Sequence, residues 1–224
     1  MHIPQPTQPQ GFFWTGDFDQ YFLGHQFEEI YKARIYKPFL ENKQNAIVLD
    51  IGANLGLFSL YAAKYAQQVY ALEPSVEHFA NFLKMLDFNQ IKNVTPINKA
   101  LWLENTKLPL FHNKNKTMYS LHQAVMDKSS PNEEVDTMTL DALFEKFKIE
   151  HVDLLKADIE GSEIEIFSSA SFKKVASKID VVITERHAWS GRNNHQLDEA
   201  LKNNGFKVET IANDADIVLA QRIK

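Results

Sequence analysis

Two glycines and two acids occupy one short stretch of the chain, residues 47–75. Gly52 and Gly56 stand four apart in a chain with only eight glycines, and they follow an apolar run that contains Asp50 near its end. Glycines in the turn after a strand remove the Cβ atoms that would hold a ligand away from the backbone. A second apolar run ends at Glu73, whose carboxylate can accept two hydrogen bonds from ribose hydroxyls. The stretch therefore predicts a nucleoside-binding turn.

The charge of Asp50 distinguishes two classes of nucleoside cofactor. The third glycine of the dinucleotide motif G-x-G-x-x-G is missing, so a pyrophosphate has a weaker backbone cradle here. A carboxylate at the end of the first strand would also repel a pyrophosphate, whereas it would attract the ammonium of S-adenosylmethionine, directly or through water. We therefore expect S-adenosylmethionine rather than NAD or NADP. The alternative is an ordinary βα turn in which Asp50 caps backbone N–H groups and Glu73 is solvated.

Four side chains near the ends of two later strands could act on a bound acceptor: Lys156, Asp158, Glu185 and His187. His187 has a reference pKa of about 6.5, which suits a general base; its alternative role is a surface histidine bonded to the next loop. Asp158 and Glu185 could together bind a hard divalent cation such as magnesium, although the sequence reveals no third ligand. Lys156 interrupts an apolar strand, so we expect it to point toward Asp158 or Glu185, at the crevice or as a structural ion pair. The flanking charged residues are Glu160, Glu163 and Arg186.

Repeated strand–helix units must position these side chains. Short runs rich in Val and Ile alternate with helical patterns, which predicts parallel strands at 47–51, 69–72, 94–98, 153–158 and 180–184. The segment 135–147 predicts a further short strand and helix. Ser75 is expected to cap one helix, and Ser162 with Glu165 to form a capping box for another.

The C-terminal part predicts a helix that ends at Gly205, followed by antiparallel strands at 206–211 and 216–220. The whole pattern predicts an α/β fold with a doubly wound, mostly parallel sheet. In such a sheet, ligands bind beyond the carboxyl ends of the strands.

Two segments fall outside this pattern. Residues 1–45 begin as a Pro- and Gln-rich arm and continue as an aromatic stretch, which predicts a helix with Pro38 near its end. We interpret them as a separate N-terminal region that acts as a lid, a packing element or a contact between two copies, and residues 46–224 as the cofactor-binding domain. The polar segment 112–134 predicts a long loop, either a second lid or exposed surface. Its expected anchors are Met118, Tyr119 and Leu121.

Composition excludes several other functions. The chain has 224 residues, 44% of them hydrophobic, which is enough for one continuous core. The formal net charge of −5 argues against nucleic acid as a partner. The absence of cysteine excludes disulfides and thiolate chemistry. Because no apolar run approaches the ~20 residues of a membrane helix and no secretory leader is evident, we expect a soluble, cytoplasmic protein.

Two segments resemble a known family. VLDIGANLGLFSLYAA is similar to motif I of Rossmann-like class I methyltransferases that use S-adenosylmethionine, and DTMTLDALFEKFKIEHVDLLKADIEGSEIEIF resembles the segment that marks the FkbM family. The resemblance covers residues 47–219. It implies a seven-stranded sheet with an antiparallel last strand, S-adenosylmethionine as methyl donor and, usually, O-methylation of a sugar or natural-product hydroxyl.

The resemblance also implies contacts with the cofactor. Gly52, Asn54 and Gly56 would line it, and Glu73 would hold its ribose. Asn98, Lys99 and Ala100 would lie near the adenine. To these we add Asp50 and Asp158 from the strand ends.

Together these observations favour an S-adenosylmethionine-dependent O-methyltransferase that acts on a small-molecule or carbohydrate acceptor. One alternative is a nicotinamide-dependent oxidoreductase on a similar sheet. Another is a binding module that keeps the nucleoside pocket without turnover.

Overall fold

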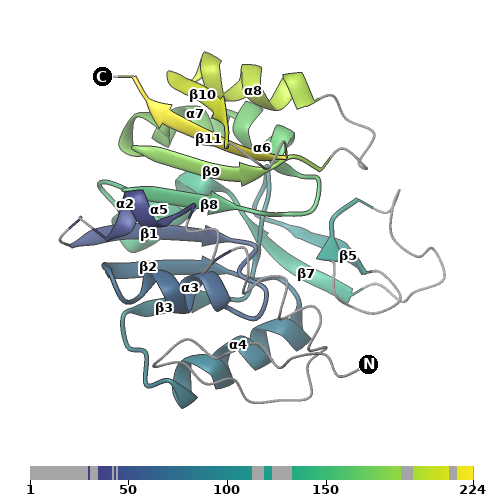
Figure 1. Ribbon diagram of the computed structural model, residues 1–224. Coiled ribbons are helices and arrows are strands. Elements are labelled where there is room, and N and C mark those ends of the chain that lie inside the picture. Colours follow the sequence, from purple (N-terminus) through teal and green to yellow (C-terminus); the bar gives the residue numbers. More distant parts are fainter. Residues whose placement is uncertain are drawn as a thin grey trace, which may run out of the picture.

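The computed structural model describes residues 30, 35–41, 43, 45–112, 119–122, 133–187, 194–211 and 216–223. Within these residues, a central sheet carries helices on both of its faces, and a smaller sheet projects beside it (Figure 1). This layered arrangement is the α/β class that the sequence predicts.

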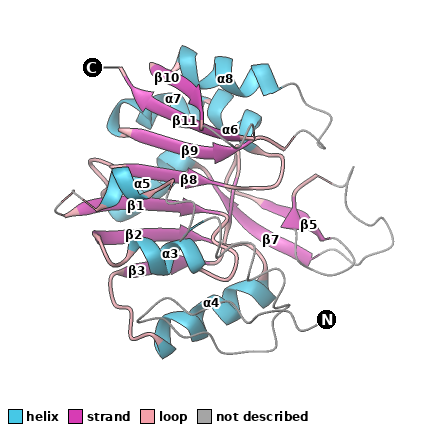
Figure 2. Cartoon of the chain, in the orientation of Figure 1, coloured by secondary structure: helices cyan, strands magenta, loops and turns pink. Residues whose placement is uncertain are grey.

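Seven strands form the central sheet in the order β10-β11-β9-β8-β1-β2-β3 (Figure 2). Their bounds are β1 Ala46–Ile51, β2 Ala66–Leu72, β3 Val94–Ile97, β8 Leu154–Ala157, β9 Val181–Glu185, β10 Phe206–Thr210 and β11 Ile217–Arg222. Neighbours from β9 to β3 are parallel, whereas β11 is antiparallel to both β9 and β10. The predicted sheet, with its antiparallel C-terminal strand, is therefore confirmed. The chain order reverses between β1 and β8, which opens a crevice at their carboxyl ends.

Helices cover both faces of this sheet, which explains why its central strands are almost continuously apolar. The helices on one face are α5 Leu140–Phe147, α6 Glu163–Ser168, α7 Ala170–Val175 and α8 Asn194–Asn203. Those on the other face are α2 Lys37–Leu40, α3 Leu57–Ala62 and α4 Val76–Phe88. Along β1, Leu49 and Ile51 belong to the first core and Val48 to the second, as the alternation of a strand requires.

A second, four-stranded sheet lies where the sequence predicted mainly a loop. Its strands are β4 Ala100–Leu101, β7 Glu133–Met138, β5 Lys107–His112 and β6 Tyr119–Ser120, in that spatial order. The strand expected at 135–138 is present, but it belongs to this sheet. The loop prediction for 112–134 is wrong at both ends, where His112 belongs to β5 and residues 133–134 belong to β7, and at Tyr119–Ser120, a two-residue strand that carries no periodicity. Tyr119 and Leu121 do pack on the small core of this sheet, whereas Met118 lies outside the described residues.

The prediction for residues 1–45 can be compared only in part. Pro38 stands in the first turn of α2, where a backbone N–H would have no intrahelical partner, and the helix predicted before it lies almost entirely outside the described residues. Tyr36 is buried, with its ring 4.5 Å from that of Phe58 in α3. The aromatic stretch 12–22 lies outside the described residues, so a lid, a contact between copies and the domain boundary at 45 stay predictions.

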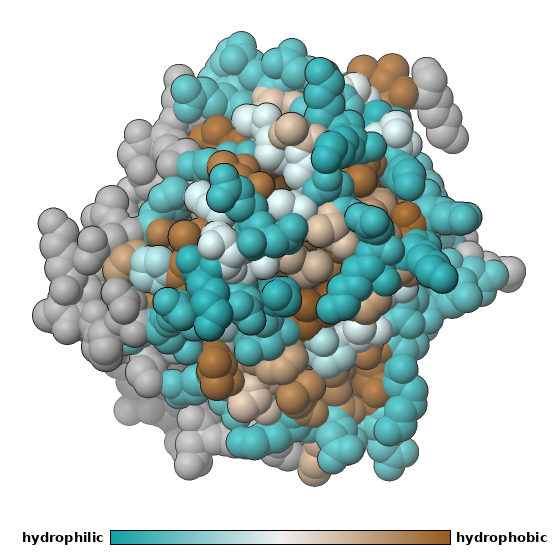
Figure 3. Space-filling model, turned by 180° about the vertical axis from the view of Figure 1, so that it is seen from behind, coloured by the Kyte–Doolittle hydropathy of each residue, from teal (hydrophilic) through white to brown (hydrophobic). Residues whose placement is uncertain are grey.

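On the face seen from behind in Figure 3, hydrophilic residues predominate and hydrophobic ones form several separate groups. Within the described ranges, no helix combines the length and apolar character that crossing a membrane requires.

Candidate active site

A cavity of about 310 Å³ lies beyond the carboxyl ends of the central strands. Strands β1, β2, β8 and β9 end at it, and the second sheet supplies the facing wall. The central-sheet side includes Gly52, Asn54, Glu73, Asp158, Glu185 and His187, and the facing side Ala100, Leu110, Tyr119, Ser120 and Leu121. A volume of this size is in the range of small-ligand pockets.

Eight of the predicted site residues line this cavity: Gly52, Asn54, Glu73, Lys99, Ala100, Asp158, Glu185 and His187. The other four predicted residues, Asp50, Gly56, Asn98 and Lys156, are not among the lining residues. The predicted residues thus gather at one cavity, and their contacts with a cofactor stay predictions.

The turn after β1 has three residues with positive φ: Gly52 at 80°, Asn54 at 53° and Gly56 at 84°. A Cβ on Gly52 would come within 1.9 Å of the Asp158 carbonyl oxygen, and one on Gly56 within 2.0 Å of the Phe82 ring. Both glycines are therefore required by packing within the protein. This corrects the prediction that Gly56 is needed for close approach of a ligand.

Glu73, which directly follows β2, is 4% exposed and lines the cavity. Its Oε2 accepts from the Asn54 N–H at 2.8 Å, and its Oε1 accepts from the Ser75 N–H at 2.8 Å. Burial raises the pKa of Glu73 to about 7, although the two backbone donors oppose this rise. The side chain is thus fixed in place and keeps acceptor capacity toward the cavity.

Asn98 supports the Glu73 turn from behind. Its amide donates to the carbonyl oxygens of Glu73 and Pro74, both at 2.9 Å. Ala100 and Lys99 line the cavity instead. Asn98 therefore shapes this turn, and its position near the adenine stays a prediction.

Asp50 is fully buried and faces other protein groups. Its Oδ2 accepts from the Ser59 hydroxyl at 2.6 Å, and its Oδ1 lies 3.7 Å from Lys156 Nζ. Burial raises the pKa of Asp50, while Lys156 and Ser59 lower it. The expected contact between Asp50 and a cofactor ammonium does not fit this arrangement, because the α3 hydroxyl and the β8 lysine occupy the carboxylate.

Lys156 lies 3.5 Å from Asp158 Oδ2 as well as near Asp50, and its Nζ donates to the Gly52 carbonyl at 3.5 Å. The expectation that Lys156 points toward Asp158 is confirmed. Because the ammonium also contacts the Gly52 turn, it positions the cavity wall from behind instead of lining it.

His187 is the centre of a group of carboxylates. Its Nδ1 lies 2.9 Å from Glu163 Oε1, and its Nε2 lies 3.3 Å from Glu160 Oε2 and 3.6 Å from Asp158 Oδ1. Burial alone would lower the pKa of His187, but the surrounding carboxylates outweigh it and raise the pKa to about 10. An imidazolium is a poor proton acceptor, so this arrangement does not favour His187 as the general base, and that role stays a prediction.

Glu163 is a site residue whose role sequence reasoning missed. It is 3% exposed and accepts from the Ile159 N–H at 2.9 Å and the Gly161 N–H at 3.0 Å. The predicted capping box is wrong: Ser162 precedes α6 at the N-cap position, but its side chain forms no capping hydrogen bond. The D-x-E-G-x-E spacing of residues 158–163 indicates a cluster of acids. It does not show that Glu163 is the one whose carboxylate accepts from the N–H groups of the preceding turn.

The second sheet contributes contacts that the sequence did not predict. The Ser120 hydroxyl donates to the Glu160 carbonyl at 2.7 Å, and the rings of Tyr119 and His78 lie 4.6 Å apart beside the cavity. Glu160 has a positive φ of 53°, so this bond supports a strained turn.

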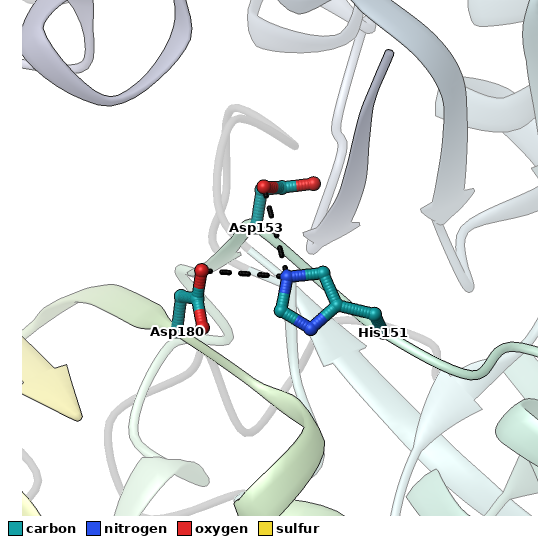
Figure 4. Close-up of side chains that lie close together, drawn as sticks. All are labelled: His151, Asp153 and Asp180. Atoms are coloured by element: carbon teal, nitrogen blue, oxygen red, sulfur yellow. Dashed lines mark ion pairs between the residues drawn. The ribbon is translucent and has the colours of Figure 1, made fainter. Parts of the chain in front are cut away.

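A similar group of side chains lies at the other end of the central strands, where His151, Asp153 and Asp180 converge just before β8 and β9 (Figure 4). His151 Nε2 is 3.7 Å from Asp153 and 3.3 Å from Asp180. Lys43 Nζ lies 2.7 Å from Asp153 and 3.2 Å from Asp180. The Lys43 ammonium therefore already contacts both carboxylates and offsets part of their charge.

Comparison with known families gives a match over most of the chain. Residues 50–208 match the model of the methyltransferase FkbM domain. A curated protein named Methyltransferase 1, from Beauveria bassiana, is 28% identical over 161 residues, which are 62% of this chain and 64% of that protein. The chain thus spans less than two thirds of the length of this relative.

Solved structures share the fold. The ribosomal protein L11 methylase of Lactobacillus delbrueckii subsp. bulgaricus superposes with a TM-score of 0.51 at 17% identity, over 89% of this chain and 80% of that one. A SAM-dependent methyltransferase from Aquifex aeolicus has a TM-score of 0.52 at 14% identity, over 92% and 100% of the two chains. A Streptococcus mutans protein solved in complex with SAH has a TM-score of 0.52 at 11% identity, over 85% and 97%.

Proposed function

Because the chain belongs to the FkbM family of methyltransferases, we propose that its cavity binds S-adenosylmethionine and that the acceptor is a hydroxyl of a small molecule or a carbohydrate. The single observation that carries the cofactor proposal is Glu73. A buried carboxylate at the end of β2, held by two backbone donors and lining the cavity, matches the hydroxyl pair of a ribose.

Other groups on the cavity wall also fit such a ligand. Asn54 Oδ1 and Ser162 Oγ are buried without a hydrogen-bond partner, and both residues line the cavity. Buried polar atoms of this kind are usually satisfied, so a ligand with several donors and acceptors complements them. Leu72, Ala100 and Leu101 offer the apolar surface that a purine base needs.

The charge of the wall favours this cofactor over a dinucleotide. Asp50 cannot make that choice by contact, since it is buried behind the cavity. Asp158 and Glu185 line the cavity, and their negative charge would repel a pyrophosphate and attract a cation. A nicotinamide-dependent oxidoreductase is disfavoured for this reason.

When bound, S-adenosylmethionine supplies a methyl carbon on a sulfonium, which an acceptor oxygen can displace in line. The chain's own contribution is to bind the nucleoside through Glu73, to hold the acceptor hydroxyl against the wall formed by residues 158–162, and to remove its proton. The carboxylates that face the cavity, Asp158, Glu160 and Glu185, are the candidate proton acceptors.

A screen of tritiated methyl transfer tests the proposal. The purified chain is incubated with S-adenosylmethionine labelled in its methyl group and with sugars, hydroxylated small molecules and their deoxy counterparts. We expect label in a hydroxyl compound and none in the matching deoxy compound. Label that persists in the deoxy compound would contradict O-methylation, and binding of S-adenosylhomocysteine without any transfer would favour a binding module.

A further inference from the structure

Three side chains from neighbouring strand ends converge on the cavity wall. Asp158 directly follows β8, Glu185 is the last residue of β9, and His187 comes two residues later. One ligand atom of each lies within 4.8 Å of those of the other two. Ligands at about 2.1 Å from a single ion lie up to about 4.2 Å apart, so small side-chain shifts bring these three atoms to one ion.

His187 is oriented as metal-binding histidines usually are. Its Nδ1 lies 2.9 Å from the buried Glu163 carboxylate, which the Ile159 and Gly161 N–H groups hold in place. A carboxylate on one ring nitrogen fixes the imidazole and presents the other nitrogen to an ion, which would displace the proton that Nε2 carries in the ion-free protein. The Nε2 atom accordingly faces Asp158 and Glu160, at 3.6 and 3.3 Å.

This wall contains more negative than positive groups. Asp158, Glu163 and Glu185 contribute three carboxylates beside the Glu160 carboxyl group, whereas the positive groups are His187 and Lys156, and Lys156 divides its ammonium between Asp158 and Asp50. Glu160 Oε2 is buried without a hydrogen bond, and the Ser162 side chain, on a residue only 1% exposed, has no hydrogen-bond partner for its Oγ. Both residues line the same cavity. Oxygen-rich, negatively charged walls of this kind suit a hard divalent cation.

The group at the amino ends of β8 and β9 can be compared with the three residues at the cavity. His151, Asp153 and Asp180 also bring one histidine and two carboxylates together, but Lys43 contacts both carboxylates and His151 is exposed (Figure 4). At the cavity the histidine is 5% exposed in its side chain and is held by Glu163. Both groups consist of one histidine and two carboxylates. They differ in the cation that contacts the carboxylates and in whether a buried acid orients the histidine ring.

We propose that Asp158, Glu185 and His187 bind one divalent cation, Mg²⁺ or Mn²⁺, at the end of the cavity next to residues 158–162. This proposal deepens the proposed function, on which it rests for its role: an ion at this point would polarise an acceptor hydroxyl. Ion binding itself is measured without any acceptor.

The test uses Mn²⁺ and the loss of its free-ion electron paramagnetic resonance signal. The full chain is titrated with Mn²⁺ in the presence and absence of S-adenosylhomocysteine, and binding of the nucleoside is measured separately by calorimetry. We expect one Mn²⁺ per chain, with binding weakened roughly tenfold or more in Asp158→Asn, Glu185→Gln and the supporting variant Glu163→Gln. The matched control Asp180→Asn removes a carboxylate from the second group and should leave Mn²⁺ binding unchanged.

The outcomes separate the two proposals. If S-adenosylhomocysteine binds but Mn²⁺ does not, the cation proposal fails and the proposed function stands. If Asp180→Asn abolishes Mn²⁺ binding and Asp158→Asn does not, the ion is held by the group that contains His151 and Asp153, and the proposal also fails. Failure of S-adenosylhomocysteine to bind, with Mn²⁺ bound as expected, would count against the proposed function alone. A variant that has lost its thermal unfolding transition is not folded, and the remaining variants among Asp158→Asn, Glu185→Gln and Glu163→Gln are then used in its place.

Discussion

Glu73 is the residue on which the cofactor proposal depends most, and its protonation should control binding. Burial raises its pKa to about 7, and Asp50 and Glu133 add to this rise. Because ribose hydroxyls donate to the ionised form, the bound state favours loss of the proton. Affinity for S-adenosylhomocysteine should therefore rise with pH, by up to about tenfold per unit below pH 7, and level off above it.

Calorimetry across this pH range, with a chelator present, checks the prediction. Glu73→Gln should weaken binding and flatten its pH dependence. Glu160→Gln, which alters a partly exposed acid elsewhere on the cavity wall, should keep this pH dependence. An affinity for the wild-type chain that does not change with pH, or that falls as pH rises, would contradict the assignment of Glu73.

The same burial affects stability in the ligand-free protein. Between an ordinary carboxyl pKa of 4.5 and the folded value of about 7, the folded state binds more protons at Glu73 than the unfolded state does. The contribution of Glu73 to the free energy of unfolding therefore falls as pH rises through this window, by on the order of 3 kcal/mol in total. A site that destabilises the free protein in this way is typical of a binding group.

Asp50 and Lys156 form a buried pair whose partners depend on each other. Asp50 is fully buried and Lys156 is 7% exposed, so Lys156→Met should leave an uncompensated charge in the core and reduce the free energy of unfolding by about 3–5 kcal/mol. The double variant Asp50→Leu with Lys156→Met should lose markedly less than the sum of the single changes. Urea denaturation measures all three, and additive losses would mean that the two side chains do not interact.

At the residue scale, the sequence predicted which residues belong to the site better than it predicted which protein groups each of them contacts. Glu73 and the Gly52 turn could be predicted because the ends of apolar runs and the spacing of glycines can be read directly from the sequence. The burial of Asp50 could not, because it depends on Ser59 from α3 and Lys156 from β8, which only the folded sheet brings together. The raised pKa of His187 likewise depends on carboxylates of a neighbouring loop.

At the element scale, the turn after β1 is fixed by what lies against its two glycines. The Gly52→Ala change meets the Asp158 backbone, which cannot move without displacing β8, and should reduce the free energy of unfolding by more than about 2 kcal/mol. Gly56→Ala meets the Phe82 side chain, so its cost should shrink when Phe82 is also changed to Ala.

Gly205→Ala is the matched control for these two changes. It has a similar φ of 85°, but the added Cβ would meet only the end of the Arg222 side chain, at 3.1 Å. Its cost should stay near the roughly 1 kcal/mol of the left-handed conformation itself. Denaturation curves compare all three, and equal losses would refute the assignment of distinct neighbours to the glycines.

The elements themselves were predicted to different degrees. The central strands were recognisable because burial on both faces makes them short apolar runs, and Ser75 caps α4 as expected, with its Oγ accepting from the His78 N–H. Strand β5 was missed because Pro109 and an exposed Lys107 conceal its two buried positions, Leu110 and His112. The capping box at Ser162 is absent because the Ser162 side chain makes no capping hydrogen bond, and Glu163 instead accepts from the Ile159 and Gly161 N–H groups that precede the helix.

At the scale of the whole molecule, the cavity lies between the central sheet and the second sheet. Residues 51–54 and 72–74 form one side, residues 119–121 another, and Ser120 joins the second sheet to the Glu160 turn. The sequence predicted the first side from its alternation of strands and helices. It could not predict the second, because short antiparallel strands far apart in the chain leave no local pattern. A cytoplasmic location, a contact between copies and the absence of nucleic-acid partners stay predictions.

The central claim, that this cavity takes S-adenosylmethionine and not a dinucleotide, is tested most directly by calorimetric titration of the chain with S-adenosylhomocysteine, NAD and NADP in turn. The account predicts saturable binding of S-adenosylhomocysteine at one site per chain, weakened by Glu73→Gln, and no heat of binding from either dinucleotide. Saturable binding of NAD or NADP, with none of S-adenosylhomocysteine, would contradict it.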